Sequence, residues 1–437
     1  MKKIFLSISF LTIILVGKTQ ETVYPAKAQQ QTIALINATI HIGNGEIIEN
    51  GMVLFLKGKI VDVKPSSTNI ADAKVIDCKG KHIYPGLISA QTNLGLVEIG
   101  STRSTVDERE LGEINSNVRS LIAYNSDSKI IGSLRANGIL LANVIPQGGI
   151  ISGSSSIVQL DAWNWEDAAY KTDAGLHFRV PNLSGARGGR AAFLAQLGFG
   201  GGQTDPVKAA LERIENVRKF FNEAKAYFNE AKHEHTNLKF EAVKLLFEQK
   251  QNFYVHAETV KEIQVGVEFA KEFGFKTVLI GGTDSWMITD YLKENNVPVI
   301  LGEMHNLPVT QDDDVDQPYK TPFLLQQAGV LFAIGDVDEN TRGRNLMFNA
   351  GTAVAYGLTK EQALQAITLN AAKILGIDDR TGSLEKGKDA NIVISDGDIL
   401  DMKSSNVSLA FIQGREVSLD NKQKQLYEKY KYKYSIK

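Results

Sequence analysis

Cysteine is almost absent from this chain, because Cys78 is its one cysteine in 437 residues. A single cysteine excludes an intramolecular disulfide and a metal site built from several thiolates. Its neighbours, Val75 to Asp77 and Lys79-Gly80, are typical of a strand end and a turn, so we expect Cys78 to be structural. An excess of charge is also missing, since the formal net charge is -2. This balance gives no electrostatic reason to expect nucleic acid or an anionic membrane as a partner.

Two sequence signatures are missing as well. The glycine-rich run from Gly198 to Gly202 lacks the Gly-Lys-Ser/Thr ending of a phosphate-binding loop, so we interpret it as a flexible connector. We find no internal repeat with the period of a solenoid or a propeller. The remaining composition, 43% hydrophobic and 22% charged, is that of a globular protein. Its length favours a large barrel with an appendage, or two domains.

The N-terminus has the pattern of an export signal. Lys2 and Lys3 precede an apolar run from Ile4 to Val16, after which the chain becomes polar. An uncleaved membrane anchor is the alternative, but the run is shorter than the roughly 20 residues that a membrane-spanning helix needs. No cysteine follows the run, so we expect no lipid anchor. We predict a signal peptide over residues 1–28, an exported protein (periplasmic or secreted), and no integral membrane span after signal removal.

Strand-like segments lie at both ends of the chain. Residues 31–83 contain short β-branched runs separated by turns such as Gly43-Asn44-Gly45. Residues 381–420 have the same character, with Ala390 to Ser395 followed by Val407 to Ile412. Neither part can bury much surface alone, so we predict that both form one small β-sandwich subdomain. Residues 421–437 remain as a C-terminal tail.

The centre of the chain, residues 84–380, alternates short apolar strands with amphipathic helices. Such alternation indicates a parallel sheet covered by helices, either open or closed into a barrel. Active sites in these sheets lie at the carboxyl ends of the strands, so polar residues directly after the strands are the candidates. The expected strands are Leu140 to Ile145, Val158 to Leu160, Phe253 to His256, Thr277 to Ile280, Val297 to Leu301 and Val330 to Ile334.

One insertion interrupts this alternation. Residues 205–251 are strongly helical, with Lys and Glu interspersed among Ala, Leu and Phe. We predict two long helices, broken near His233 to Asn237, that project from the barrel wall as a hairpin. A projecting pair of helices would suit either a dimer contact or a lid.

Four segments together resemble the amidohydrolase superfamily, and within it the imidazolonepropionase-like and prolidase-like branch. They are Tyr84-Pro85-Gly86-Leu87-Ile88, Asn349 to Val354, Ile367 to Lys373 and Gly382 to Ala390. The resemblance implies an α/β fold with a distorted (β/α)8 TIM-type barrel and a divalent metal centre in its mouth. It also implies hydrolysis of C–N or related bonds by metal-activated water, since a metal lowers the pKa of bound water toward neutrality.

The metal-binding positions that the resemblance implies are only partly filled. His256 at strand five and Asp336 at strand eight stand where the family has ligands, and Asp336 also stands at the general-base position. Gln91 and Asn93 occupy the His-x-His positions. Amide oxygens are weaker ligands than imidazole for a transition metal. Gly281 stands where strand six should carry a histidine, and His177 is the best match to the strand-four ligand.

This degenerate set predicts little metal. Two matching ligands do not make a tight site, which needs three or four donors. We expect at most one divalent, zinc-like ion, and no ion is equally compatible with the sequence. Asp284, Glu303, His305 and the acidic run Asp312 to Asp314 could supply substitute ligands. For the acidic run a solvated loop is the simpler interpretation.

Arg342 and Arg344 follow Asp336 in the loop after strand eight. A guanidinium near a barrel mouth can bind a substrate carboxylate through two hydrogen bonds, so both are candidate substrate-binding residues. A structural ion pair with Asp338 or Glu339 is the alternative.

Two functions remain open at this point. One is a hydrolase of non-peptide C–N bonds, in a cyclic amide, or of small peptide-like substrates. The other is a catalytically silent member of the fold that acts as a ligand-binding protein or as a partner subunit. The expected partner is a small-molecule substrate or ligand. The chain could also form a homo-oligomer or pair with an active relative.

Export predicts that the mature protein lacks its N-terminal segment. N-terminal sequencing of the protein from its native host should find a start before about residue 30 and well after Met1. A mature protein that retains Met1 would contradict the prediction.

Overall fold

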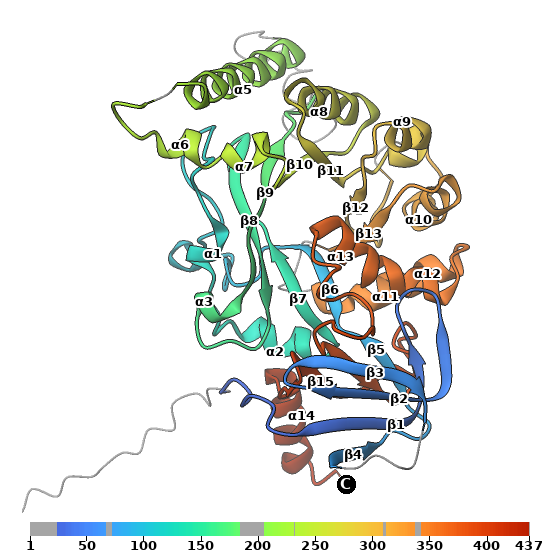
Figure 1. Cartoon of the computed structure of the whole chain (residues 1–437). Helices are drawn as coiled ribbons and strands as arrows, with labels where there is room; N and C mark the ends of the chain where they lie inside the picture. The colour runs from blue at the N-terminus through green and yellow to red at the C-terminus, as the bar shows by residue number, and fades with distance from the viewer. Residues whose placement is uncertain are drawn as a thin grey trace, which may run out of the picture.

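The computed structural model describes residues 24–66, 72–183, 205–230, 232–308, 312–336 and 342–436. Two eight-stranded sheets form a barrel and a smaller terminal subdomain (Figure 1). Most of the predicted signal peptide and the connector Gly198 to Gly202 lie outside the described residues. The helices are η1 (Arg103–Thr105), α1 (Ser120–Ala123), α2 (Lys129–Arg135), α3 (Trp165–Ala168), α5 (Pro206–Phe228), α6 (Leu238–Glu241), α7 (Lys244–Phe247), α8 (Val260–Phe273), η2 (Ser285–Ile288), α9 (Thr289–Glu294), α10 (Gln317–Ala328), η3 (Gly343–Asn345), α11 (Leu346–Ala355), α12 (Lys360–Ala366), α13 (Leu369–Leu375) and α14 (Lys422–Lys433).

The barrel sheet has the order β13-β12-β11-β10-β9-β8-β7-β6. Its strands are β6 (Leu87–Thr92), β7 (Ile139–Val144), β8 (Ile151–Gln159), β9 (Ala169–Arg179), β10 (Asn252–Ala257), β11 (Lys276–Gly281), β12 (Val299–Leu301) and β13 (Phe332–Ile334). Strands β9 to β13 are parallel, as are β6 and β7. Strand β8 is antiparallel to both of its neighbours, so a hairpin replaces one strand–helix repeat. The distorted barrel expected from the sequence is confirmed.

Apolar side chains fill the barrel interior. One core cluster takes a residue from each strand and then continues into α13, which contacts both edge strands, β6 and β13. The amide of Ile88 donates to the carbonyl of Ile367 at 2.9 Å, so the segment that leads into α13 covers the seam between these edges. Because the interior is packed, polar side chains are left to collect at the carboxyl ends of the strands. The strand residues of this cluster are Ile88, Ala90, Leu141, Ile157, Tyr170, Ala174, Tyr254, Val278, Ile280, Ile300 and Ala333.

The terminal sheet joins the two ends of the chain. Strand β5 pairs in parallel with β1 and antiparallel with β14, which links the N-terminal and C-terminal strands. The rings of Phe55 and Phe411 are 5.0 Å apart, although their strands lie four steps apart in the sheet. Four steps would separate them by about 19 Å in a flat sheet, so the sheet folds over its own core and the predicted subdomain is confirmed. Its strands are β1 (Thr32–His41), β2 (Ile47–Leu56), β3 (Lys59–Pro65), β4 (Ala73–Asp77), β5 (His82–Pro85), β14 (Ile392–Ser395), β15 (Val407–Ile412) and β16 (Arg415–Glu416).

The helical hairpin predicted for residues 205–251 is not present. One long helix, α5, is followed by two single-turn helices, α6 and α7. The buried face of α5 belongs to the main core, and the ring of Phe221 lies 5.2 to 5.9 Å from those of Phe253, Phe269 and Phe275. The charged residues that suggested projection occupy the outer face of a helix that covers the barrel wall.

The first described residues contact the folded unit. The amide of Ala26 donates to the buried carboxylate of Asp161 at 2.9 Å, and the side chain of Gln29 accepts from the amide of Gly58 at 2.9 Å. These contacts lie within or next to the predicted signal peptide, residues 1–28, so any cleavage is expected before Tyr24. Within the described ranges, no helix is both long and apolar enough to cross a membrane.

The packing of α5 can be tested by truncating Phe221. Its side chain is fully buried, so Phe221→Ala should lower the free energy of unfolding by about 3–5 kcal/mol through lost burial and a residual cavity. Urea or guanidinium denaturation would measure the change. Leu211→Ala on the exposed face of the same helix is the control and should cost well under 1 kcal/mol. Equal losses for the two variants would contradict the observed packing.

Candidate active site

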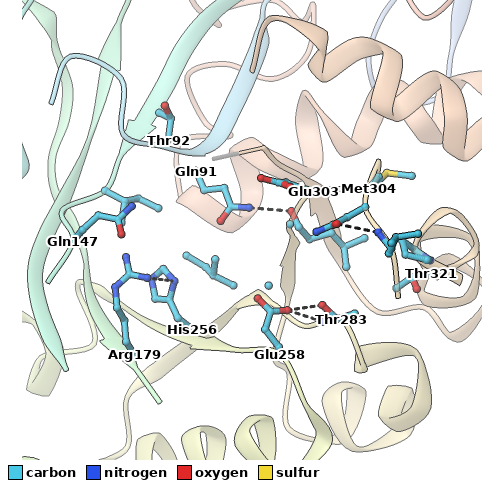
Figure 2. A pocket seen from close by; sticks show the side chains of 18 residues that line it. Gln91, Thr92, Gln147, Arg179, His256, Glu258, Thr283, Glu303, Met304 and Thr321 are labelled. Atoms are coloured by element: carbon cyan, nitrogen blue, oxygen red, sulfur yellow. Dashed lines mark hydrogen bonds between the residues drawn. The ribbon is translucent and has the colours of Figure 1, made fainter. Parts of the chain in front are cut away.

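A cavity of about 520 Å³ opens at the barrel mouth. Figure 2 shows Arg179 and His256 on one side and Glu258 with Thr283 beside them, with Gln91 above. The lining combines apolar and polar side chains from the carboxyl ends of the strands, where this fold places its sites. The lining residues are Gln91, Thr92, Ile145, Gln147, Arg179, His256, Glu258, Ile280, Gly281, Thr283, Leu301, Gly302, Glu303, Met304, Asn306, Leu307, Pro318 and Thr321.

Three side chains at this mouth form a continuous hydrogen-bond chain. Arg179 Nη1 lies 3.4 Å from His256 Nδ1, and His256 Nε2 lies 2.8 Å from His177 Nδ1. A guanidinium can only donate, so His256 Nδ1 accepts and His256 Nε2 carries the proton. His256 then donates to His177 Nδ1, and the proton of His177 is on Nε2. That nitrogen is buried and has no hydrogen-bond partner among the described residues.

The electrostatic surroundings keep both imidazoles neutral. Burial, with Arg179 next, lowers the pKa of His177 well below its usual value. The same two causes, in the same order, lower the pKa of His256, and His177 adds to them. The ring of His177 also stacks on that of Tyr254, with centroids 4.7 Å apart, so the pair belongs to the floor of the site.

These donors do not fit a metal ion. Both nitrogens of His256 already take part in hydrogen bonds, so neither has a lone pair directed at the cavity. A guanidinium at 3.4 Å also repels a cation. Among the described residues, no group of three or more His, Cys, Asp or Glu side chains could hold a metal. The structure brings together two of the predicted ligands, His177 and His256, but as partners of each other.

The two amides at the His-x-His positions make protein contacts. Gln91 Nε2 donates to the carbonyl of Leu301 at 3.1 Å, which ties β6 to β12. A side chain at residue 335 would approach Gln91 Cγ to 2.7 Å, so Gly335 provides the space for this arrangement. Asn93 Nδ2 donates to the carboxylate of Glu108 at 3.2 Å. Both residues therefore connect neighbouring segments.

Gly281 provides the space for a carboxylate. It ends β11 with φ of +94°, and a Cβ atom built there would overlap the carboxyl group of Glu258. Strand pairing sets Ala257 beside Gly281, which brings Glu258 to the same edge of the barrel. The carboxylate of Glu258 thus occupies the space of the side chain that the resemblance expects at position 281.

Glu258 is the cavity acid that the sequence motifs did not identify. The side chain is exposed to the cavity, and partial desolvation by the surrounding walls raises the pKa of Glu258. The hydroxyl and amide of Thr283 donate to Glu258 Oε2 at 2.5 and 3.2 Å and partly offset that effect. A strand period of two could have found it, since Glu258 follows His256 by two residues and Arg179 likewise follows His177.

The remaining predicted site residues lie around this cavity without lining it. Asp336 is buried, and its Oδ2 accepts from Asn349 Nδ2 at 3.5 Å. Arg342 forms an ion pair with Glu303, which does line the cavity. Arg344 is exposed. Asp338 and Glu339, the alternative partners of the two arginines, lie outside the described residues.

The other candidate ligands also have protein partners. Asp284 Oδ2 accepts from the amide of Val260 at 3.2 Å, and His305 Nε2 lies 2.8 Å from the hydroxyl of Thr352. In the acidic run, Asp314 pairs with Lys320 at 2.8 Å and is largely exposed.

Comparisons with known proteins agree with this fold. The model of the amidohydrolase family matches residues 209–417. The imidazolonepropionase of Rhizobium rhizogenes is 26% identical over 396 residues, which are 82% of this chain and 90% of that protein. That of Brucella anthropi is 25% identical over 390 residues, 80% of this chain and 88% of that protein. The crystal structure of an amidohydrolase from Thermotoga maritima covers 88% of this chain and 99% of its own, with 27% identity and a TM-score of 0.76.

The chain belongs to the amidohydrolase superfamily. Within the superfamily it resembles the imidazolonepropionase-like branch, and at the level of the family this likeness is to hydrolases of C–N bonds. This chain departs from the family pattern at the barrel mouth, where amidohydrolases typically hold a divalent metal. In this amidohydrolase the same region contains a guanidinium, two hydrogen-bonded imidazoles and the carboxylate of Glu258.

The pairing of Gly281 with Glu258 can be tested by a double-mutant cycle. Gly281→Ala should destabilise the protein by about 2–4 kcal/mol, because a side chain at positive φ is strained and its Cβ overlaps the carboxylate. In a Glu258→Ala background the overlap disappears, so we expect a coupling of about 1–3 kcal/mol. Gly274→Ala is the control, because it has φ of +71° with nothing within 4 Å and reports the backbone strain alone. Additive losses at positions 258 and 281 in denaturant titrations would contradict the pairing.

Proposed function

We propose that this amidohydrolase is a hydrolase of non-peptide C–N bonds that acts on a cyclic amide, or on a small peptide-like substrate, in the mouth cavity. Membership of the family and the likeness to proteins named imidazolonepropionase support the reaction class. The cavity, about 520 Å³ with mixed lining, is in the range of small-molecule sites. The export predicted from the sequence would place the reaction outside the cytoplasm.

The position of Glu258 is the observation that carries this proposal. Its carboxylate faces the cavity, and two hydrogen bonds from Thr283 fix its orientation. A carboxylate in this position can take a proton from water as the water attacks the amide carbon, and then give it to the leaving nitrogen. We assign this role to Glu258 in preference to Asp336, because Asp336 is not among the residues that line the cavity.

We propose that the reaction proceeds without a metal pair. Gln91 and Asn93 offer amide oxygens, which are weak ligands for a transition metal, while their amide nitrogens donate to protein acceptors, and His256 has no lone pair directed at the cavity. The expectation of at most one divalent ion therefore remains a prediction, and the proposed chemistry does not depend on that ion.

Binding without turnover is the second candidate function. The same unsuitable donor set supports it, because loss of the metal removes the water activation on which the family relies. In that case the chain would hold a small ligand, alone or as a homo-oligomer, or serve as the partner subunit of an active relative.

A panel of substrates can decide between the two functions. Hydantoins, lactams and N-acyl amino acids would be incubated with the purified chain, and the released carboxylate or amine would be followed by mass spectrometry. We expect turnover that resists chelators, and a drop in kcat of at least about 100-fold for Glu258→Gln, which cannot accept a proton. Glu223→Gln, on the exposed face of α5, is the matched control.

Turnover that is lost on chelation and restored by zinc would contradict the metal-independent reaction. Binding of panel members without any turnover would favour the second function.

A further inference from the structure

A half-buried positive charge at the cavity, the guanidinium of Arg179, lacks a carboxylate partner. Arg179 stays protonated although burial lowers its pKa. Its hydrogen-bond partners are all neutral and all distant: Ser152 Oγ at 3.2 Å, the carbonyl of Pro146 at 3.4 Å and His256 Nδ1 at 3.4 Å. Glu108 is the carboxylate that affects its pKa most, yet Glu108 itself pairs with Arg109 at 2.8 Å.

A second arginine of the chain, Arg135, is buried and has a carboxylate partner. Arg135 is 6% exposed and forms an ion pair with the carboxylate of Asp161 at 2.8 Å. Burying a cation is costly unless an anion accompanies it. The fold supplies that anion for Arg135, whereas among the described residues no carboxylate lies within 4.0 Å of Arg179. The unmet charge faces the cavity, where a ligand could meet it.

Hydrogen-bond counting gives the geometry of that ligand group. A guanidinium has five N–H donors, and the three contacts of Arg179 use one on Nε, one on Nη1 and one on Nη2. Each terminal nitrogen therefore keeps one N–H. One donor on Nη1 and one on Nη2 can serve the two oxygens of a carboxylate.

We infer that Arg179 forms an anion-binding subsite in this cavity and holds the carboxylate of a small ligand. A fixed guanidinium thus provides positive charge at a mouth where the family typically holds a metal. The inference rests on the cavity assigned under the proposed function and adds the charge class of the molecule bound there. Glu258, on the same cavity, remains available to a polar N–H of that ligand.

Matched probes test the subsite by binding alone. N-acetylglycine carries a carboxylate, and N-acetylglycinamide is its neutral isostere. Calorimetry on the full chain should give a dissociation constant at least tenfold lower for the acid. Arg179→Gln should reduce this preference to less than twofold, and Arg179→Lys should keep part of it, because the charge remains and the two-pronged geometry is lost. Arg213→Gln, on the exposed face of α5, is the control and should leave the preference for the acid unchanged.

A second variant avoids any change to Arg179 itself. Gln147 follows Pro146 and lines the same cavity (Figure 2). Gln147→Glu is nearly isosteric and would offer the guanidinium an internal carboxylate, so it should also abolish the preference for the acid. Circular dichroism and a melting curve would verify that each variant is folded.

Several outcomes would overturn the inference. The first is an unchanged preference for the acid over the amide in both Arg179→Gln and Gln147→Glu. The second is loss of that preference in Arg344→Gln instead. The third is the absence of binding of N-acetylglycine or of inorganic phosphate at concentrations up to about 50 mM. Because the readout is binding, a chain that binds the acid through Arg179 but turns nothing over would support this subsite and contradict only the hydrolase proposal.

Discussion

The guanidinium of Arg179 lies at the end of β9 and donates to the ring of His256, which in turn donates to His177. This contact fixes the tautomers of both imidazoles and keeps their lone pairs away from the cavity. It also places a positive charge at a mouth where the family typically holds a metal. His177 and His256, which match ligand positions of the family, are therefore hydrogen-bonded to each other and to Arg179. Because these two imidazoles are taken up by hydrogen bonds, the chemistry of the mouth depends on its other polar side chains.

The substitutions at the mouth fit one another in space. Gly281 leaves room for the carboxylate of Glu258, and Gly335 leaves room for the side chain of Gln91. The carboxylate of Glu258 fills the space where the resemblance expects a histidine side chain at position 281, and Gln91 comes from the neighbouring strand to lie against Gly335. A site that had merely lost its ligands would not require such matched changes. The pairing indicates a mouth built around polar groups other than the family's metal ligands.

The barrel and the terminal subdomain could be predicted from the sequence, because both depend on apolar periodicity and on recognisable segments such as Tyr84 to Ile88. A strand period of two places Glu258 and Arg179 on the same face as the two histidines, but the roles of these residues could not be predicted. Each depends on which strand lies beside which, for example on the pairing of Ala257 with Gly281. The packing of α5 was missed for a related reason. A charged outer face is common to a projecting helix and to a helix that covers a barrel wall, and only the phenylalanine cluster around Phe221 distinguishes them.

Stability and function make opposite demands on the mouth. A half-buried guanidinium without a carboxylate partner and a partly desolvated carboxylate both raise the energy of the empty site, since each would be better solvated in water. The chain could lower that cost by placing a carboxylate beside Arg179, as it does with Asp161 beside Arg135. The two charged groups instead remain on one cavity and are oriented by neutral donors and acceptors. Such an arrangement is stabilised most by a ligand that carries complementary groups, a carboxylate for Arg179 and a polar N–H for Glu258. The site therefore selects such ligands because they relieve the electrostatic cost that is present when it is empty.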